Sequence, residues 1–81
     1  LEFWHIAKTE GWFDYCYVEI STDGGNTYEP IPASAYLGSA NRYIDMLRFH
    51  EYSYTTWGSA NETPTNTWWK KETFDLKDFR S

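Results

Sequence analysis

Residues 15–31 read YCYVEISTDGGNTYEPI and carry the clearest structural pattern in this chain. Every second residue from Cys16 to Ile20 is apolar, which is typical of a half-buried strand. The run Asp-Gly-Gly-Asn at 23–26 follows directly, and such a run favours a tight turn between two strands. The segment 27–31 is expected to return as the second strand. The stretch therefore predicts a β-hairpin.

The turn of this hairpin fits an Asp-box pattern, made by Ser21, Asp23, Gly25, Thr27 and Tyr28. We expect the Asp23 carboxylate to accept backbone N–H groups across the turn, as in an Asx-turn. Glycine supplies the positive φ angles that such a turn needs, and Tyr28 is expected to fold under the loop as an apolar plug. The pattern resembles the boxes of bacterial sialidases, which are structural. We interpret it as a structural turn; calcium at Asp23 is the alternative.

The remainder of the chain also favours strands. Residues 1–7 and 68–79 are rich in strand-forming side chains, and residues 32–42 and 58–67 are expected to be loops. Residues 40–47 have apolar side chains at helical spacing, yet 43–52 can equally be read as a strand. We predict an all-β fold, an antiparallel β-sandwich with at most one short helix.

The amino-acid composition limits the classes of partner that this chain is expected to bind. The 81 residues include 12 acidic and 7 basic side chains, so the net charge of −5 argues against nucleic acid, whose binders need clustered Lys and Arg. No apolar run approaches the roughly 20 residues that span a bilayer, so no membrane insertion is expected. The 17 aromatic residues exceed what a core of this size can hide. Some rings are expected to be exposed or to pack on protein outside this chain.

No catalytic residue is predicted. His5 and His50 lack metal-ligand spacing and are expected to be structural or surface residues. The single cysteine, Cys16, is expected to be buried on the apolar face of a strand, where a thiol is inert. We therefore expect a protein without enzymatic activity of its own.

Two separated segments resemble a known family. These are 1–31, through residues 1–5, Glu10, 13–15 and 18–25, and 68–79, through Trp69–Leu76. They are similar to the MAM-like or cleaved-adhesin-like jelly rolls of secreted bacterial peptidases (immune-inhibitor-A-like or gingipain-like). The resemblance implies a concanavalin-like jelly roll, with 1–81 forming a single β-sandwich domain or an internal fragment of one. It also implies an extracellular or cell-surface location and a non-catalytic accessory or adhesion module. Its partners would be the remainder of the parent chain and an extracellular glycan or protein.

A carbohydrate-binding module is the alternative function. Aromatic rings stack on the apolar faces of sugars, and the candidates in or near loops are Trp12, Trp57, Trp68 and Tyr52, with Asn61 and Asn66 as polar partners. The competing interpretation places these rings in the core. The family resemblance further implies structural calcium, with Glu10 and Asp14 among its ligands. An ordinary solvated acidic loop explains the same two residues equally well.

Overall fold

The computed structural model describes residues 1–10, 12–58 and 61–79. It contains two antiparallel sheets of two strands each, in which β1 (Glu2–His5) pairs with β4 (Lys70–Thr73) and β2 (Glu19–Ile20) pairs with β3 (Glu29–Pro30). One α-helix, α1 (Asn41–Met46), and three short 3-10 helices, η1 (Ala33–Ala35), η2 (Asn66–Trp68) and η3 (Lys77–Phe79), complete the elements. The described residues are thus mostly β with little helix, and a complete sandwich is not seen among them.

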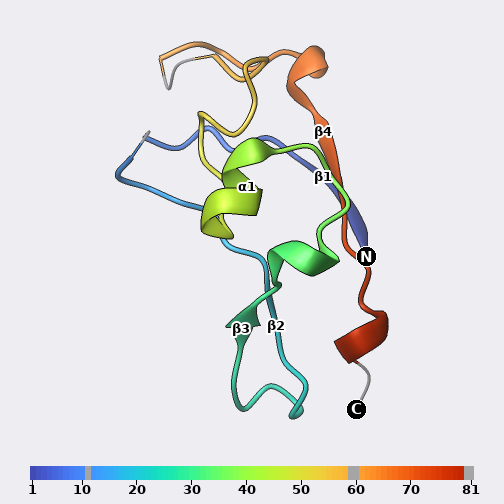
Figure 1. Ribbon diagram of the computed structural model, residues 1–81. Helices are drawn as coiled ribbons and strands as arrows, with labels where there is room; N and C mark the ends of the chain where they lie inside the picture. Colours follow the sequence, from blue (N-terminus) through green and yellow to red (C-terminus); the bar gives the residue numbers. More distant parts are fainter. Residues whose placement is uncertain (11, 59–60, 80–81) are drawn as a thin grey trace.

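The β1–β4 sheet joins the two ends of the chain (Figure 1). Its register places Phe3 opposite Glu72 and Trp4 opposite Lys71. The strand predicted over 68–79 is shorter than expected, because the chain beyond Thr73 turns to the segment around Tyr36. The N–H of Leu37 donates to the Thr73 carbonyl, and the N–H of Asp75 donates to the Ala35 carbonyl. The last described element is the 3-10 helix η3, where the sequence predicted a strand.

The predicted hairpin is present, with β2 and β3 on either side of the 21–27 turn. It extends away from α1 and from the β1–β4 sheet (Figure 1). Residues 15–18 do not join the sheet as predicted; Cys16 instead forms an isolated antiparallel bridge with Phe49. The expectation of a buried Cys16 is wrong: its side chain is exposed, because no second layer of protein covers this face. Partial desolvation still raises the pKa of its thiol.

The ambiguous segment 40–52 is helical only over α1. The helix ends at Leu47, which adopts a left-handed conformation with φ of 57°. Ala40 and Tyr43 are fully buried, whereas Ile44 points outward and is half-exposed. After the helix, Phe49 makes a single isolated bridge with Cys16 and no strand forms over 43–52, so the helical alternative describes this segment better.

Six aromatic side chains form the centre of the core, supported by small and aliphatic residues. They are Tyr36, Tyr43, Phe49, Trp57, Trp68 and Phe74. The rings of Tyr43 and Phe49 stack with centroids 4.8 Å apart, and Phe74 meets Tyr43 edge-on at 5.2 Å. Aromatic packing therefore replaces the aliphatic core that this sequence lacks.

One predicted loop is only partly described. Residues 59–60 of the expected loop at 58–67 lie outside the described residues, as does Gly11. Among the helices that are described, none has the length and apolar character needed to cross a bilayer.

Candidate functional site

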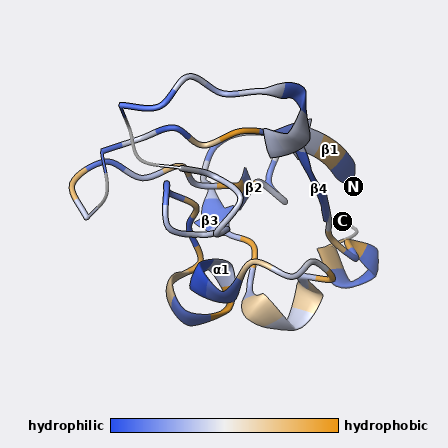
Figure 2. Ribbon diagram, turned by 90° about the horizontal axis from the view of Figure 1, so that it is seen from above, coloured by the Kyte–Doolittle hydropathy of each residue, from blue (hydrophilic) through white to orange (hydrophobic). Residues whose placement is uncertain are grey.

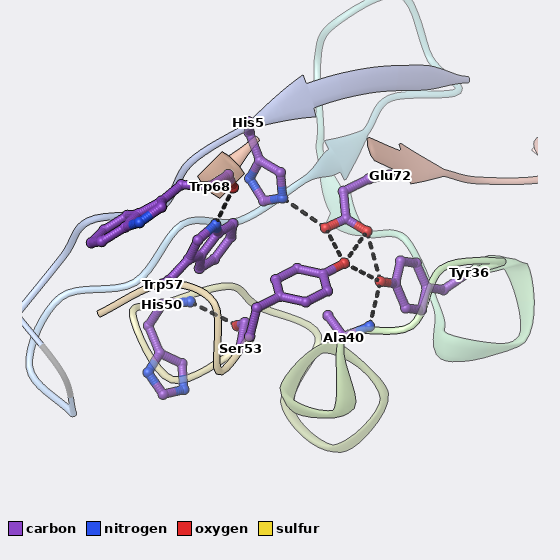
Figure 3. Close-up of polar contacts among 9 residues, drawn as sticks. His5, Tyr36, Ala40, His50, Ser53, Trp57, Trp68 and Glu72 are labelled. Atoms are coloured by element: carbon purple, nitrogen blue, oxygen red, sulfur yellow. Dashed lines mark hydrogen bonds and ion pairs between the residues drawn. The ribbon is translucent and has the colours of Figure 1, made fainter. Parts of the chain in front are cut away.

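A buried carboxylate, Glu72, lies at the centre of a hydrogen-bond network between the sheet and the α1 side of the molecule. Figure 3 shows it between His5 from β1 and the tyrosine hydroxyls opposite. His5 Nε2 lies 2.7 Å from Glu72 Oε2, the Tyr36 hydroxyl donates to Oε1 at 2.7 Å, and the Tyr54 hydroxyl lies 2.8 Å from Oε2. Glu72 has no exposed surface. Its burial is made possible by these partners, since an unpaired charge in a core is costly.

The tyrosines of this network are hydrogen-bond donors at neutral pH. Burial, followed by hydrogen bonding to Glu72, raises the pKa of Tyr36 well above its usual range. Burial likewise raises the pKa of Tyr54 to about 12. The Tyr36 hydroxyl also accepts the N–H of Ala40 at 2.8 Å, which fixes the start of α1. Both Glu72 carboxylate oxygens and the hydroxyls of Tyr36 and Tyr54 have hydrogen-bond partners inside the protein. We therefore assign this network a structural role.

Tyr54 connects this network to a surface pocket. The pocket has a volume of about 340 Å³ and is lined by Ser39, Asn41, Arg42, Asp45, Tyr52, Ser53, Tyr54 and Thr55. Its size falls at the lower end of the range for small-molecule sites, about 300–1,000 Å³. The α1 residues supply a positive, a negative and an amide side chain, and the 52–55 segment supplies two aromatic rings and four hydroxyl groups.

An aromatic–arginine cluster adjoins this pocket; we use the term for Trp12, Tyr15, Arg42, Arg48, His50 and Tyr52. The Trp12 and Tyr52 rings lie 5.6 Å apart at an interplanar angle of 32°, and both are about half-exposed, at 46% and 51%. The Arg42 guanidinium lies 4.6 Å from the centroid of the Trp12 ring, a cation–π contact. Tyr52 and Arg42 line the pocket and Trp12 contacts both, so the Trp12 and Tyr52 rings form an exposed aromatic surface at the rim of the pocket.

Backbone conformation and a buried imidazole hold this surface in place. Trp12 has φ of 67°, a left-handed conformation that is costly for a bulky residue. Its ring packs 5.0 Å from that of His50, which also contacts Tyr52 and Tyr15. Burial, then the charges of Arg42 and Arg48, lower the pKa of His50. A neutral His50 thus supports the exposed rings from below.

The second arginine of the cluster is held outside the pocket. The Arg48 guanidinium lies 3.6 Å from the centroid of the Tyr15 ring. Its Nε and the Nε2 of His50 are both buried without a hydrogen-bond partner within the described part of the chain. The cluster therefore alternates cationic and aromatic groups, with Arg48 at one end and Arg42 at the pocket.

The structure brings together two of the four rings proposed for carbohydrate binding. Trp12 and Tyr52 meet at the pocket, but Trp57 and Trp68 are buried in the core and cannot present a stacking face. The Trp57 indole N–H donates to the Trp68 carbonyl at 2.6 Å (Figure 3), so burial satisfies its polar atom. Asn61 and Asn66 are exposed but do not line this pocket.

Among the residues that line the pocket, sequence reasoning proposed only Tyr52. The α1 residues that it missed are Asn41, Arg42 and Asp45. Their polarity and the helical spacing were visible, but nothing in the sequence placed α1 beside Trp12. Glu72 was missed for a different reason: β4 is hydrophilic along its length (Figure 2), so its pattern did not indicate a buried residue.

Hydrogen bonds between residues of the Asp-box turn itself hold this turn in its conformation. Asp23 Oδ1 accepts the N–H groups of Asn26 at 3.1 Å and Thr27 at 2.9 Å, and Ser21 Oγ accepts the N–H of Gly25 at 2.8 Å. Hydrogen bonds from the Thr27 side chain and backbone, then from Ser21, lower the pKa of Asp23 to about 2. Gly24 and Gly25 adopt the positive φ angles, 74° and 92°.

Tyr28 does not fill the role of an apolar plug beneath this loop. Its side chain is 62% exposed. The hairpin projects away from α1 and from the β1–β4 sheet (Figure 1), and the Tyr28 ring stays in contact with solvent.

Glu10 and Asp14, the residues proposed for calcium, lie on an exposed turn. The Glu10 carbonyl accepts the N–H groups of Phe13 at 3.2 Å and Asp14 at 2.9 Å. Within 1–10, 12–58 and 61–79, no three His, Cys, Asp or Glu side chains gather as a metal-binding group. Calcium takes six to eight oxygen ligands, and two carboxylates alone do not supply them. We therefore derive no chemistry from a metal.

A second pocket, of about 280 Å³, lies between η1 and η3. It is lined by Pro32, Ser34, Ala35, Asp75, Lys77, Asp78 and Phe79. It contains a single aromatic ring and no stacked pair, so the pocket beside Trp12 is the stronger candidate site.

Comparison with protein-family models, with curated proteins and with solved structures gave no match for this chain.

Proposed function

We propose that this chain is a non-catalytic binding module of a secreted or cell-surface protein, and that its ligand is a carbohydrate. The observation that carries the proposal is the exposed Trp12–Tyr52 pair at the rim of a polar pocket. Sugar rings have apolar C–H faces that stack on aromatic rings and hydroxyl edges that need hydrogen-bonding partners. The cluster and its pocket offer both kinds of contact within one site.

The polar side chains of the pocket suit hydroxyl groups. Asn41 both donates and accepts, Asp45 accepts, and Arg42 donates. Because Trp12 is held by His50 and by its backbone conformation, little side-chain order is lost when a ligand binds. The two rings are inclined by 32°, so we propose that they hold one or two sugar units rather than a long flat chain.

The carbohydrate proposal is tested by titrating the 81-residue chain with soluble oligosaccharides and following tryptophan fluorescence and backbone amide NMR signals. Trp12→Ala is expected to weaken binding by about tenfold or more, a loss of about 1.4 kcal/mol. Trp4→Ala is the matched control, because Trp4 is 62% exposed and lies on β1, away from this pocket. Equal effects of the two variants, or no binding by any sugar tested, would overturn the proposal.

An accessory role in a larger bacterial protein, such as a secreted metallopeptidase, is proposed from the sequence resemblance, and one surface supports it. Trp4 is opposite Lys71 in the sheet register, and Trp69 precedes Lys71 by two residues, so alternation puts all three on the outer face of the β1–β4 sheet. The Trp4 and Trp69 rings are largely exposed there. We propose that this face packs on the remainder of the parent chain, within a jelly-roll sandwich.

Sedimentation tests this docking surface. The isolated chain is expected to self-associate through the exposed tryptophans, because uncovered apolar surface favours association. The double variant Trp4→Lys, Trp69→Lys should then be monomeric, while Trp12→Lys should associate like the unmodified chain. A monomeric unmodified chain at high concentration would contradict the proposal.

A further inference from the structure

Neither arginine of the aromatic–arginine cluster lies within ion-pair distance of a carboxylate in the described part of the chain, although the chain is acidic. Its net charge is −5, and the ion pairs found among the described residues are His5–Glu72, Lys71–Glu2 and Lys77–Asp75. Arg42 and Arg48 are both partly buried. The charge of the buried Glu51 acts on His50, as do the charges of the two arginines. In the described part of the chain, however, neither guanidinium reaches a carboxylate at ion-pair distance, so both can still bind an anion.

The position of Arg42 suits the capture of an anion. It lies on α1, lines the 340 Å³ pocket and is stacked on Trp12. Stacking occupies the face of the planar guanidinium and leaves its N–H edges to donate. Two N–H groups on one edge of a guanidinium match the two oxygens of a carboxylate. Because the contact with Trp12 already restricts the Arg42 side chain, less entropy is lost when a ligand binds.

The electrostatics of the neighbourhood agree with this position. Arg48, over the Tyr15 ring, adds a second positive charge outside the pocket. Burial and then the charges of both arginines lower the pKa of His50, and the charge of Glu51 raises it. The Asp45 carboxylate also lines the pocket, yet Asp45 and Arg42 form no ion pair with each other in the part of the chain described. The pocket therefore has separate positive and negative groups, which suits a ligand that carries both an anionic group and hydroxyls.

We propose that the pocket selects sugars that carry a carboxylate, with Arg42 binding the carboxylate and Asp45 accepting hydrogen bonds from hydroxyl groups. This inference rests on the proposed carbohydrate function and specifies its ligand class. The Trp12 and Tyr52 rings would hold the apolar face of the same sugar unit.

The test compares a galacturonic acid trisaccharide with the matching neutral galactose trisaccharide, by amide NMR titration at low and at high salt. The acidic sugar is expected to bind about tenfold more tightly at low salt, because a charge-assisted bidentate contact is stronger than a neutral one. High salt should reduce this preference and leave the neutral affinity unchanged.

Two arginine variants separate charge from geometry. Arg42→Gln should make the affinities for the acidic and the neutral trisaccharide equal, and Arg42→Lys should restore only part of the acidic preference, because lysine lacks the planar fork. Arg48→Gln is the matched control and should keep most of the preference, since Arg48 is outside the pocket. Dispersed amide spectra of each variant establish that it is folded.

The outcomes distinguish this inference from the function on which it rests. Equal affinity for acidic and neutral sugars would overturn the carboxylate inference and leave carbohydrate binding standing. Tighter binding of a sulfated galactose trisaccharide than of the galacturonate would also overturn it. Binding of neither trisaccharide, or tighter binding of a single-stranded oligonucleotide, would overturn both.

Discussion

Replacing the buried Glu72 by alanine should severely destabilise this protein. The substitution removes the acceptor for His5 Nε2 and for the Tyr36 and Tyr54 hydroxyls, all of which lie within 3.0 Å of the carboxylate. Each donor left without a partner costs about 1–3 kcal/mol, although such costs do not add fully. For three donors that lose one shared acceptor, we therefore expect a cost of about 3–5 kcal/mol as a whole.

The cost of Glu72→Ala is large relative to the total free energy of unfolding. At ~0.05–0.15 kcal/mol per residue, a chain of this length has a free energy of unfolding of about 4–12 kcal/mol. We therefore expect Glu72→Ala to lower the free energy of unfolding by about 3–5 kcal/mol and to leave a substantial unfolded fraction. Urea denaturation followed by circular dichroism and tryptophan fluorescence measures the change.

A milder variant keeps the test informative if Glu72→Ala does not fold. Glu72→Gln retains one acceptor oxygen, and its amide can donate to a tyrosine hydroxyl, so a smaller loss of about 1–3 kcal/mol is expected. Glu29→Ala, on the exposed strand β3, is the control and should change stability by less than about 0.5 kcal/mol. If Glu72→Ala and Glu29→Ala unfold at the same urea concentration, the reasoning is refuted.

Three further substitutions test single contacts. Thr27→Val removes a hydroxyl that donates to Asp23, so NMR titration should find the pKa of Asp23 raised from about 2 towards 3.8. His50→Phe should flatten the pH dependence of stability below pH 6.5, measured by urea denaturation. Because the pKa of His50 is lower in the folded protein than in the unfolded chain, unfolding below pH 6.5 takes up a proton at His50. The contribution of His50 to the free energy of unfolding is therefore full above pH 6.5 and is lost as the pH falls. Trp57→Phe leaves the Trp68 carbonyl without its donor and should cost about 1–3 kcal/mol in the same assay.

Each of these tests has a control on the same chain. Thr22→Val, in the same turn, should leave the pKa of Asp23 at about 2; a rise equal to that of Thr27→Val would contradict the assigned bond. Parallel pH profiles for the unmodified chain and His50→Phe would contradict the His50 assignment. Trp4→Phe should cost less than about 0.5 kcal/mol, because Trp4 is exposed, and a cost equal to that of Trp57→Phe would count against the indole hydrogen bond.

Calcium binding at Glu10 and Asp14 stays a prediction of the sequence, and thermal unfolding tests it. If these carboxylates bind calcium, adding the ion after chelation raises the melting temperature by mass action. The double variant Glu10→Gln, Asp14→Asn should then remove the increase. An unchanged melting temperature in the original chain would exclude a stabilising calcium site.

The features that sequence alone predicted are local ones. The 23–26 turn was predictable because glycine conformation and the side chains of Ser21, Asp23 and Thr27 close it within seven residues. The strands at both ends were predictable from their composition, and the exposed Trp12 and Tyr52 were recognised as candidate ligand-binding rings. Short-range sterics and hydrogen bonds decide such features wherever the segment lies in the fold.

Only the tertiary structure decided which residues share a site or a core. Trp57, Trp68, Trp12 and Tyr52 look alike in the sequence, but the first two meet Phe49 and Phe74 in the core and the last two meet at a pocket. Glu72 lies on a polar strand, and its burial depends on hydroxyls supplied from 18 and 36 residues away. Such contacts join distant segments, and their free energy depends on burial and on partners that no local pattern contains.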